Sequence, residues 1–441
     1  MYNNFMIKVA LLGAGSSVFA KHVLGDILCT PELSSCEIAL YDIDNIRLSE
    51  SHAMIDKINR NINGSKARIN TYLGPTQRRD ALRGAGFVIN AIQVGGYEPC
   101  TVTDFEIPRK YGLLQTIADT LGIGGIMRAL RTFPVMQDFA REIEEVAPEA
   151  LFLNYTNPMG ILTGYMLRAT KVKTIGLCHS VQECAKELLE PLGYDWKNVR
   201  TRIAGINHMA WLLSLTDANG KDLYPEVKKA ARARTDKHKD MVRYEYLRRL
   251  GYYVTESSEH NAEYNPWFIK KAKPELIDEY NIPIDEYLSR CVKNIEKWDT
   301  QKKELIDNDN IIHEKSSEYA AGIIEGIVCN KPYKFNGSVL NQGLISNLPP
   351  EACVEIPCIA DGLGIQPIAV GALPVQCAAM NMTNINVQLL TIEAMVTGEK
   401  QYIYHAAMLD PHTAAELSLE EIYAMVDELI AAHGDWLPKF V

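Results

Sequence analysis

The chain has 441 residues, of which 47% are hydrophobic and 23% charged, and its formal net charge is −10 at pH 7. This length and balance are typical of a globular protein with two domains, or of one large α/β body with a closely packed second part. An acidic chain without a long lysine- or arginine-rich run argues against a nucleic-acid or anionic-membrane partner, and its apolar runs are far shorter than the roughly 20 residues that span a bilayer.

The chain opens with MYNNFMIKVALLG, in which no basic segment precedes the apolar stretch and a glycine turn follows it directly. This pattern predicts a first β-strand rather than a signal peptide. The ten cysteines are scattered, without a C-x-x-C pair, so we expect most of them to be buried thiols. Both features predict a cytoplasmic location.

The first 180 residues alternate short apolar runs with amphipathic stretches, such as residues 18–28, which have helical spacing. The apolar runs predict five strands, at residues 7–12, 37–44, 87–94, 150–154 and 173–178. Strands that alternate with helices are typical of a parallel sheet covered on both faces. The predicted fold class is therefore α/β, with a doubly wound, Rossmann-like sheet.

The pattern changes after about residue 180. Helix-like stretches cover residues 181–192 and 228–250, a strand-like region with frequent glycine and proline spans 336–374, and residues 417–433 close the chain as a helix. We therefore predict two domains, a Rossmann-like domain at residues 1–180 and an α+β domain at residues 181–441.

A glycine-rich turn, GAGSS at residues 13–17, follows the first predicted strand and opens a helical segment. Glycine is needed there because a side chain would keep the backbone away from a pyrophosphate bound at the helix N-terminus. The full fingerprint has a third glycine three positions later, where this chain has Val18. Gly13, Gly15 and Ser16 are therefore candidate cofactor-binding residues on an incomplete motif.

An acid after the second predicted strand supports this interpretation. Asp42 lies where a carboxylate can accept the ribose hydroxyls of NAD and disfavour the 2′-phosphate of NADP. Asp44, two residues later, could share that role. The alternative is an ordinary strand, turn and helix with solvated acids, but the context favours cofactor binding.

Three short polar stretches lie in apolar surroundings, at residues 154–158 (NYTNP), 178–180 (CHS) and 207–208 (NH). The first two follow predicted parallel strands, beyond whose carboxyl ends ligands bind. A thiolate and an imidazole brought together there would suit zinc, or manganese completed by substrate oxygens and water. A buried thiol with two hydrogen-bonded histidines is the alternative, and spacing alone favours it. The residues by themselves indicate no more than a dehydrogenase of a secondary alcohol.

Nine runs, spread over nearly the whole chain, are distinctive in combination. They are GYEPCTVTDFEI (96–107), QTIADTLG (115–122), GGIMRALRT (124–132), NYTNPM (154–159), GLCHSVQ (176–182), AGINHMA (204–210), VTESSEH (254–260), TNINVQ (383–388) and YHAAMLDPHTAA (404–415). In these runs the chain resembles glycoside hydrolase family 4 and, within it, the bacterial α-galactosidases. The resemblance implies a dinucleotide-binding domain like that of lactate and malate dehydrogenases, joined to an α+β domain that completes the active site.

The resemblance also implies a mechanism that needs no pair of carboxylates. NAD, regenerated in each turnover, would oxidise carbon 3 of the sugar, which acidifies the proton on carbon 2 and allows elimination of the leaving group from carbon 1. Water would then add, and NADH would reduce the ketone. A divalent metal, usually Mn²⁺, would bind the hydroxyls on carbons 2 and 3. The implied substrate is a small molecule, a terminal α-galactoside such as melibiose.

By the same resemblance, Cys178 and His208 would be the protein ligands of the metal. Asn157 and Asp119 would hold sugar hydroxyls, and Arg128 would lie near them. These five residues come from both predicted domains, so the resemblance implies a site built between them.

Three residues are candidates for proton transfer. His179 stands directly after Cys178, where several relatives have an acid, and would help the leaving group depart or orient the sugar hydroxyls. The base at carbon 2 is expected in the run YYVTESSEHNAEY, near the place where the phospho-sugar branches of the family use a tyrosine. Glu256 is the first candidate for that base, and Tyr253 is the second.

Two other functions stay open from the sequence. A dehydrogenase of a hydroxy acid or sugar would share the cofactor domain but release NADH. A sugar-sensing binding protein would keep NAD without catalysis, and the intact Cys178, His208 and Asn157 argue against it. A sister family member acting on α-glucosides, galacturonides or 6-phospho-sugars would differ in specificity only. We expect a homo-oligomer, a dimer or a tetramer, with no nucleic-acid or membrane partner.

Overall fold

The computed structural model describes residues 7–441. The segment MYNNFM, on which the prediction of no signal peptide partly rests, lies outside these residues. The strands are β1 (Lys8–Leu12), β2 (Glu37–Asp42), β3 (Arg68–Leu73), β4 (Phe87–Asn90), β5 (Leu151–Asn154), β6 (Lys173–Gly176), β7 (Val199–Ile206), β8 (Met209–Asp217), β9 (Tyr253–Val254), β10 (Tyr333–Leu340), β11 (Cys353–Asp361) and β12 (Gly364–Pro367). In this part of the chain they form one sheet of twelve strands, in the order β3-β2-β1-β4-β5-β6-β10-β11-β7-β8-β9, with β12 beside β11.

The strands from β3 to β6 are parallel and form the doubly wound half of the sheet. The helices and turns of this half are α1 (Ser17–Cys29), η1 (Pro31–Leu33), α2 (Asn45–Asn63), α3 (Gly74–Leu82), η2 (Gly96–Thr101), α4 (Val102–Lys110), α5 (Gly122–Val146) and α6 (Met159–Ala169). Successive residues of β1 face opposite layers: Val9 packs in the same core as Val23 of α1, and Ala10 in the core that holds Ile126 of α5. The predicted Rossmann-like sheet, covered on both faces, is confirmed.

The remaining strands continue the same sheet in antiparallel fashion, joined to the parallel half where Ser338 of β10 pairs with Gly176 of β6. Their helices and turns are α7 (Ser180–Leu189), η3 (Glu190–Leu192), α8 (Tyr224–Ala233), α9 (Met241–Arg249), α10 (Ser258–Glu263), α11 (Glu275–Glu279), α12 (Glu286–Lys302), η4 (Lys303–Asp307), α13 (Tyr319–Cys329), α14 (Val375–Thr397), α15 (Gln401–Leu409), α16 (Pro411–Glu416), α17 (Leu419–His433) and η5 (Gly434–Trp436).

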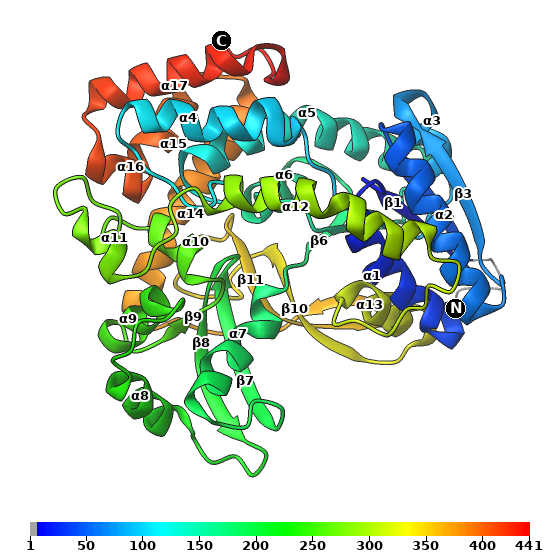
Figure 1. Cartoon of the computed structure of the whole chain (residues 1–441), viewed down its shortest axis with the longest axis horizontal. Coiled ribbons are helices and arrows are strands. Elements are labelled where there is room, and N and C mark those ends of the chain that lie inside the picture. The colour runs from blue at the N-terminus through cyan, green and yellow to red at the C-terminus, as the bar shows by residue number, and fades with distance from the viewer. Residues whose placement is uncertain (1–6) are drawn as a thin grey trace.

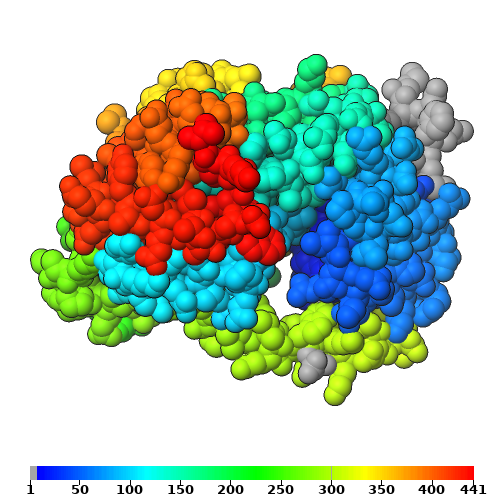
Figure 2. All heavy atoms as spheres, turned by 90° about the horizontal axis from the view of Figure 1, so that it is seen from above, coloured from blue at the N-terminus to red at the C-terminus, as the bar shows by residue number. Residues whose placement is uncertain are grey.

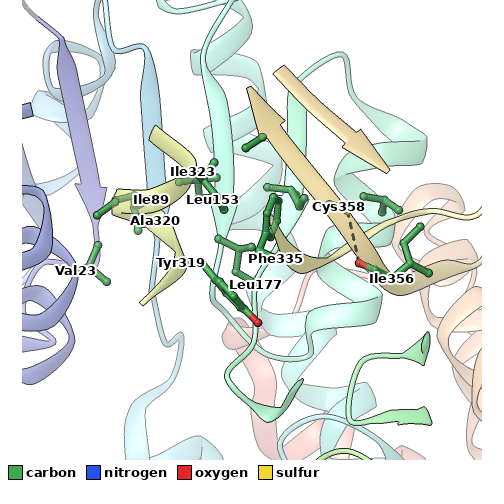
Figure 3. Close-up of a cluster of buried hydrophobic side chains, with 14 of the residues drawn as sticks. Val23, Ile89, Leu153, Leu177, Tyr319, Ala320, Ile323, Phe335, Ile356 and Cys358 are labelled. Atoms are coloured by element: carbon green, nitrogen blue, oxygen red, sulfur yellow. Dashed lines mark hydrogen bonds between the residues drawn. The ribbon is translucent and has the colours of Figure 1, made fainter. Parts of the chain in front are cut away.

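The two halves share their hydrophobic interior. Figure 3 shows one such region, where Ile89 and Leu153 of the parallel strands lie with Ile323 of α13 and Phe335 of β10. The C-terminal helices α15 and α17, at the upper left of Figure 1, also pack in one core with α5. The last parallel strand ends at Gly176, but a continuous sheet and shared cores cross this point, so the boundary at residue 180 stays a prediction. Within residues 7–441, no helix is long and apolar enough to cross a membrane.

Candidate active site

The glycine turn lies between β1 and α1, as the sequence predicts. Gly13 has φ +85°, and a Cβ at this position would lie 2.7 Å from the backbone oxygen of Ala91, so only glycine fits the turn. The Gly15 amide donates a hydrogen bond of 2.6 Å to the carboxylate of Asp42, at the end of β2. The turn and the acid that the dinucleotide hypothesis requires are therefore in contact.

Asp44 has a different local role from Asp42. Its carboxylate accepts hydrogen bonds from the amides of Ile46 (2.9 Å) and Arg47 (3.0 Å) and so caps the N-terminus of α2. Asp42 is therefore the acid that faces the glycine turn. Ser16 precedes α1 and is exposed, with its side chain making no cap hydrogen bond.

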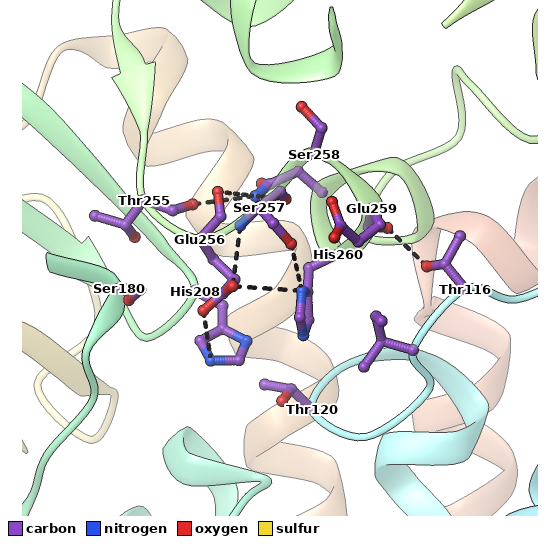
Figure 4. Close-up of polar contacts among 12 residues, drawn as sticks. Thr116, Thr120, Ser180, His208, Thr255, Glu256, Ser257, Ser258, Glu259 and His260 are labelled. Atoms are coloured by element: carbon purple, nitrogen blue, oxygen red, sulfur yellow. Dashed lines mark hydrogen bonds and ion pairs between the residues drawn. The ribbon is translucent and has the colours of Figure 1, made fainter. Parts of the chain in front are cut away.

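Three potential metal ligands converge from three separate segments, and Figure 4 shows two of them, His208 and Glu256. Cys178 follows β6, His208 lies in the turn between β7 and β8, and Glu256 lies between β9 and α10. Their ligand atoms all lie within 4.8 Å of one another, and His208 Nε2 is 3.3 Å from Glu256 Oε2. The sequence placed Cys178 and His208 together, and the structure adds Glu256 to the same cluster.

Two of these ligands have backbones in the left-handed region, with φ +64° at His208 and φ +63° at Glu256. A residue other than glycine held there costs about 1–3 kcal/mol, and such residues cluster at functional sites. A hydrogen bond of 3.0 Å between His208 Nδ1 and the Tyr264 hydroxyl leaves Nε2 directed at Glu256. These two backbone conformations lower the stability of the fold, and they hold the side chains of His208 and Glu256 together in one orientation.

The cluster is strongly coupled electrostatically. Burial disfavours charge on His208, but the neighbouring Glu256 and Cys178 outweigh it and raise the pKa of His208 to about 10. Burial likewise opposes ionisation of Glu256, yet His208 and His260 lower its pKa to about 2. The pKa of Cys178 is raised by burial but lowered further by His208, and lies below its usual value. Two acidic side chains, Cys178 and Glu256, thus lie around the cationic His208 imidazole, and the same arrangement would suit a bound positive ion.

The residues expected to hold the sugar lie beside this cluster. Asn157 Nδ2 donates to Asp119 Oδ2 at 3.3 Å, and His260 Nε2 lies 3.8 Å from Asp119 Oδ1. The pKa of Asp119 is raised by burial but lowered further by Arg128 and His260, so its carboxyl is ionised. His260 also contacts Glu256, at 3.4 Å, and so joins the two groups. The structure brings Asp119, Asn157 and Arg128 together around one place.

His179 stands at the start of α7, next to Cys178. Its Nε2 donates to Glu318 at 2.7 Å, and this hydrogen bond raises the pKa of the imidazole above its usual value. Nearly half of the side chain (49%) is exposed, so the ring is accessible from solvent. His179 is therefore an exposed imidazole with a raised pKa, directly next to the candidate metal ligand Cys178.

Tyr253, the second candidate base from the sequence, lies in a different buried cluster from His208 and Glu256. It is fully buried, its hydroxyl donates to Asp240, and the Arg243 guanidinium lies 4.7 Å from its ring centroid. Burial raises the pKa of Tyr253 well above its usual value. A hydroxyl that is already hydrogen-bonded in this separate buried cluster is not poised as a base.

A hollow in the surface lies between the N-terminal segments, α4 and α12 (Figure 2). Helix α12 borders this hollow, and contacts with other elements hold it at both ends. At one end Arg128 Nη1 donates to the Tyr287 hydroxyl at 3.4 Å, and at the other Lys302 Nζ lies 2.6 Å from the Glu50 carboxylate. Because Arg128 also interacts with Asp119, helix α12 is linked to the residues expected to hold the sugar.

Two family models cover most of the chain. The model for "Family 4 glycosyl hydrolase" matches residues 8–194, and that for "Family 4 glycosyl hydrolase C-terminal domain" matches residues 203–413. The chain belongs to glycoside hydrolase family 4.

Relatives within the family are similar over their whole length. An α-galactosidase of Bacillus subtilis is 58% identical over 99% of this chain and 100% of its own length. An α-galactosidase of Rhizobium meliloti is 34% identical over 98% of this chain and 89% of its own length. The predicted family membership is confirmed.

Solved structures support the fold. The 6-phospho-β-glucosidase from Thermotoga maritima with manganese, NAD⁺ and glucose-6-phosphate has a TM-score of 0.77 at 21% identity, covering 99% of this chain and 100% of that one. Malate dehydrogenase from Plasmodium falciparum with NADH has a TM-score of 0.50 at 14% identity, covering 88% and 99%. The expected likeness of the family fold to dehydrogenases is confirmed.

Sequence reasoning missed three residues that contact the candidate site, His260, Glu263 and Tyr264. All three follow Glu256 within eight residues, on or next to α10. Their common signal was available, because His260 and Glu263 are three residues apart and such residues share one face of a helix. What the sequence could not show is that this face turns towards Asp119.

Proposed function

We propose that this protein is an α-galactosidase that depends on NAD and a divalent metal, with Mn²⁺ as the first candidate. The observation that carries the proposal is the convergence of Cys178, His208 and Glu256 beside the paired Asp119 and Asn157. An enzyme of Bacillus subtilis that bears the name α-galactosidase, 58% identical over the whole chain, supports the substrate class.

The glycine turn fits NAD. Its backbone lies at the carboxyl end of β1 and at the N-terminus of α1, where a pyrophosphate is stabilised by free amides and the helix dipole. Asp42 lies against the turn through the Gly15 amide, in the place of the acid that binds ribose hydroxyls. The related Thermotoga maritima structure with NAD⁺ adds support at the level of the fold.

The donor set fits a divalent metal. A thiolate, an imidazole and a carboxylate are three ligands of types that bind first-row metals, and they leave coordination positions for substrate oxygens. When bound, NAD would accept and return a hydride, and the metal would act as a Lewis acid on the sugar hydroxyls. Cys178, His208 and Glu256 would hold the metal.

The other side chains would bind the sugar and handle protons. Asp119, ionised and paired with Asn157, would accept hydrogen bonds from sugar hydroxyls, while Asn157 would keep its carboxylate in place. Arg128 of α5, which also contacts α12 through Tyr287, would keep the Asp119 carboxyl ionised. His179, protonated through its contact with Glu318, would give a proton to the departing aglycone oxygen.

The proposed substrate class can be tested with a panel of chromogenic glycosides. We expect the purified protein, supplied with NAD and Mn²⁺, to hydrolyse p-nitrophenyl α-galactoside with a kcat/KM at least about a hundredfold above that for the α-glucoside and α-galacturonide, because a site built for one hydroxyl pattern rejects another strongly. Net NADH formation, followed at its absorbance, should be absent. Preference for another glycoside, or accumulation of NADH, would contradict the proposal.

The affinity for Mn²⁺ should increase with pH. In the metal-free protein the pKa of His208 is raised to about 10, so the imidazole is protonated at neutral pH and must lose its proton to bind a metal. The apparent affinity should therefore rise by about tenfold per pH unit between about pH 6 and pH 9 for each proton released. Calorimetry in buffers of different ionisation enthalpy would count the protons. An affinity independent of pH would contradict this assignment of His208.

We further propose that the enzyme works in the cytoplasm as a homo-oligomer. The ten cysteines are free thiols in the structure, which suits a reducing compartment. Light scattering after size-exclusion chromatography would give the number of subunits.

A further inference from the structure

The buried carboxylate of Glu263 binds the backbone of the loop that carries Asp119. Glu263 is 3% exposed, and its two oxygens accept hydrogen bonds from the backbone amides of Thr116 (2.8 Å) and Ala118 (2.8 Å). The amide of Ile117, between them, lies 3.3 Å from each oxygen. Three consecutive amides, ending directly before Asp119, therefore point at one side chain.

The same helix also reaches the Asp119 side chain. Helix α10 carries His260, whose Nε2 lies 3.8 Å from Asp119 Oδ1, and Glu263 one turn later. Figure 4 shows a second backbone link, in which Thr116 Oγ1 donates to the carbonyl oxygen of Glu259 at 2.7 Å. One short helix thus contacts both the side chain of Asp119 and the backbone that precedes it.

The loop needs such support because its conformation is unusual. Ala118 has φ +53°, which residues with a side chain adopt rarely, and its amide is one of the three that Glu263 accepts. The loop also packs closely on the start of α5, where a Cβ on Gly124 would lie 2.5 Å from the Ala118 carbonyl oxygen. Glu263 therefore binds the amides of a loop that is also packed tightly against α5.

We propose that Glu263 is a positioning residue for sugar binding, which fixes the backbone of residues 116–118 so that the Asp119 carboxylate faces the substrate. This inference rests on the proposed α-galactosidase function. Glu263 itself does not touch the sugar, the cofactor or the metal in this role. Its contribution is to the orientation of Asp119.

The role requires a carboxylate rather than any polar side chain. An ionised carboxyl group only accepts hydrogen bonds and does so with both oxygens, whereas an amide presents a donor on one side. With glutamine at position 263, an NH₂ group would face a backbone N–H and the loop would have to shift. Burial raises the pKa of Glu263 to about 7, although the amides of Thr116 and Ala118 lower it, so the variants are best compared near pH 8.5, about one and a half units higher.

The main test is Glu263→Gln, assayed with p-nitrophenyl α-galactoside in the presence of NAD and Mn²⁺. We expect KM to rise by about tenfold or more, the effect of one buried hydrogen bond left unmade. We expect kcat and the dissociation constants of Mn²⁺ and NAD to change by less than about threefold, because Glu263 contacts none of these sites. Glu259→Gln is the matched control on the same helix, since its side chain forms an ion pair with Arg290, at 3.6 Å, on the side of α12, and it should behave as wild type.

A double-mutant cycle separates positioning from a general structural effect. If Glu263 acts through Asp119, then Glu263→Gln should change KM by less than about twofold in an Asp119→Asn background, because the group it positions has already been lost. An equal effect in both backgrounds would overturn the proposal. So would an unchanged KM in the single variant, or a loss of Mn²⁺ affinity that accompanies the rise in KM.

Two further measurements keep the proposal testable if Glu263→Gln does not fold, or if the wild type lacks α-galactosidase activity. Glu263→Asp keeps a buried acid but is one methylene shorter, so KM should lie between those of wild type and Glu263→Gln, and a wild-type KM would overturn the proposal. Hydrogen exchange of the peptide covering residues 113–121 needs no activity. Its amides should be protected in the wild type and exchange about tenfold faster or more in Glu263→Gln or Glu263→Asp. Unchanged exchange would overturn the positioning role, whereas an inactive wild type with this exchange pattern would overturn only the α-galactosidase proposal.

Discussion

Hydrolysis of p-nitrophenyl α-galactoside should fall by about a thousandfold or more when either NAD or the divalent metal is removed from the protein, since a Lewis acid alone contributes several kcal/mol. The measurement is the initial rate after dialysis against a chelator, and after charcoal treatment that removes nucleotides.

Restoration defines the control for this result. Adding back Mn²⁺ and NAD together should restore the rate, and neither alone should do so. Cys178→Ser is the genetic counterpart of chelation, because a thiolate ligand is lost, and it should lower the affinity for Mn²⁺ while the protein stays folded. Cys29→Ser, at an exposed thiol, is the matched control. Full activity in protein that has been shown to contain no NAD would rule out the oxidative mechanism.

The parallel half of the fold could be predicted from sequence because its strands are buried on both faces. β1, β2 and β4 are almost entirely buried and read as continuous apolar runs. β3 (RINTYL) was missed, since it is the edge strand and all six of its residues are at least partly exposed. An edge strand of mixed polarity resembles a loop unless its place in the sheet is known.

The second half was harder for a different reason. β7 and β8 form a hairpin whose two-residue turn, Asn207-His208, carries a metal-ligand candidate, but the run before it begins with alternating arginines. The helix-like stretch at 228–250 is two helices, α8 and α9, separated by residues 234–240. The sequence does not reveal this break, because charged residues are common both in helices and in loops.

The candidate site shows where local patterns stop being sufficient. Cys178 and His208 could be connected only through the resemblance to the family, because they lie thirty positions apart in the sequence. The role of Glu256 was proposed as that of a base, and its contact with His208 comes from the backbone turn at φ +63°. Asp44 was a reasonable second acid, but a carboxylate two residues before a helix amide is also the usual N-cap.

The last prediction concerns Glu256, which the structure places both among the metal-ligand candidates and beside His260. Elimination requires the proton on carbon 2 to leave, so galactose produced in deuterium oxide should carry deuterium at carbon 2, whereas displacement at carbon 1 never breaks that bond. Glu256→Gln should lower kcat by about a hundredfold or more and abolish the exchange, since general-base catalysis contributes at least that much. Mass spectrometry and NMR of the product would measure both.

The affinity for Mn²⁺ in Glu256→Gln then distinguishes the two roles. Because its carboxylate completes the three-donor set, we expect the affinity to fall by about tenfold or more. An unchanged affinity together with lost exchange would identify Glu256 as the base alone, and retained exchange would exclude it as the base. Tyr253→Phe is the matched control, because the Tyr253 hydroxyl is bound to Asp240. This variant should lose about 1–3 kcal/mol of stability, because Asp240 Oδ2 loses the hydrogen bond from Tyr253 while Oδ1 keeps those from Arg243 and Ser258. It should keep both exchange and metal affinity, which follows directly from the position of Tyr253 outside the cluster of Cys178, His208 and Glu256.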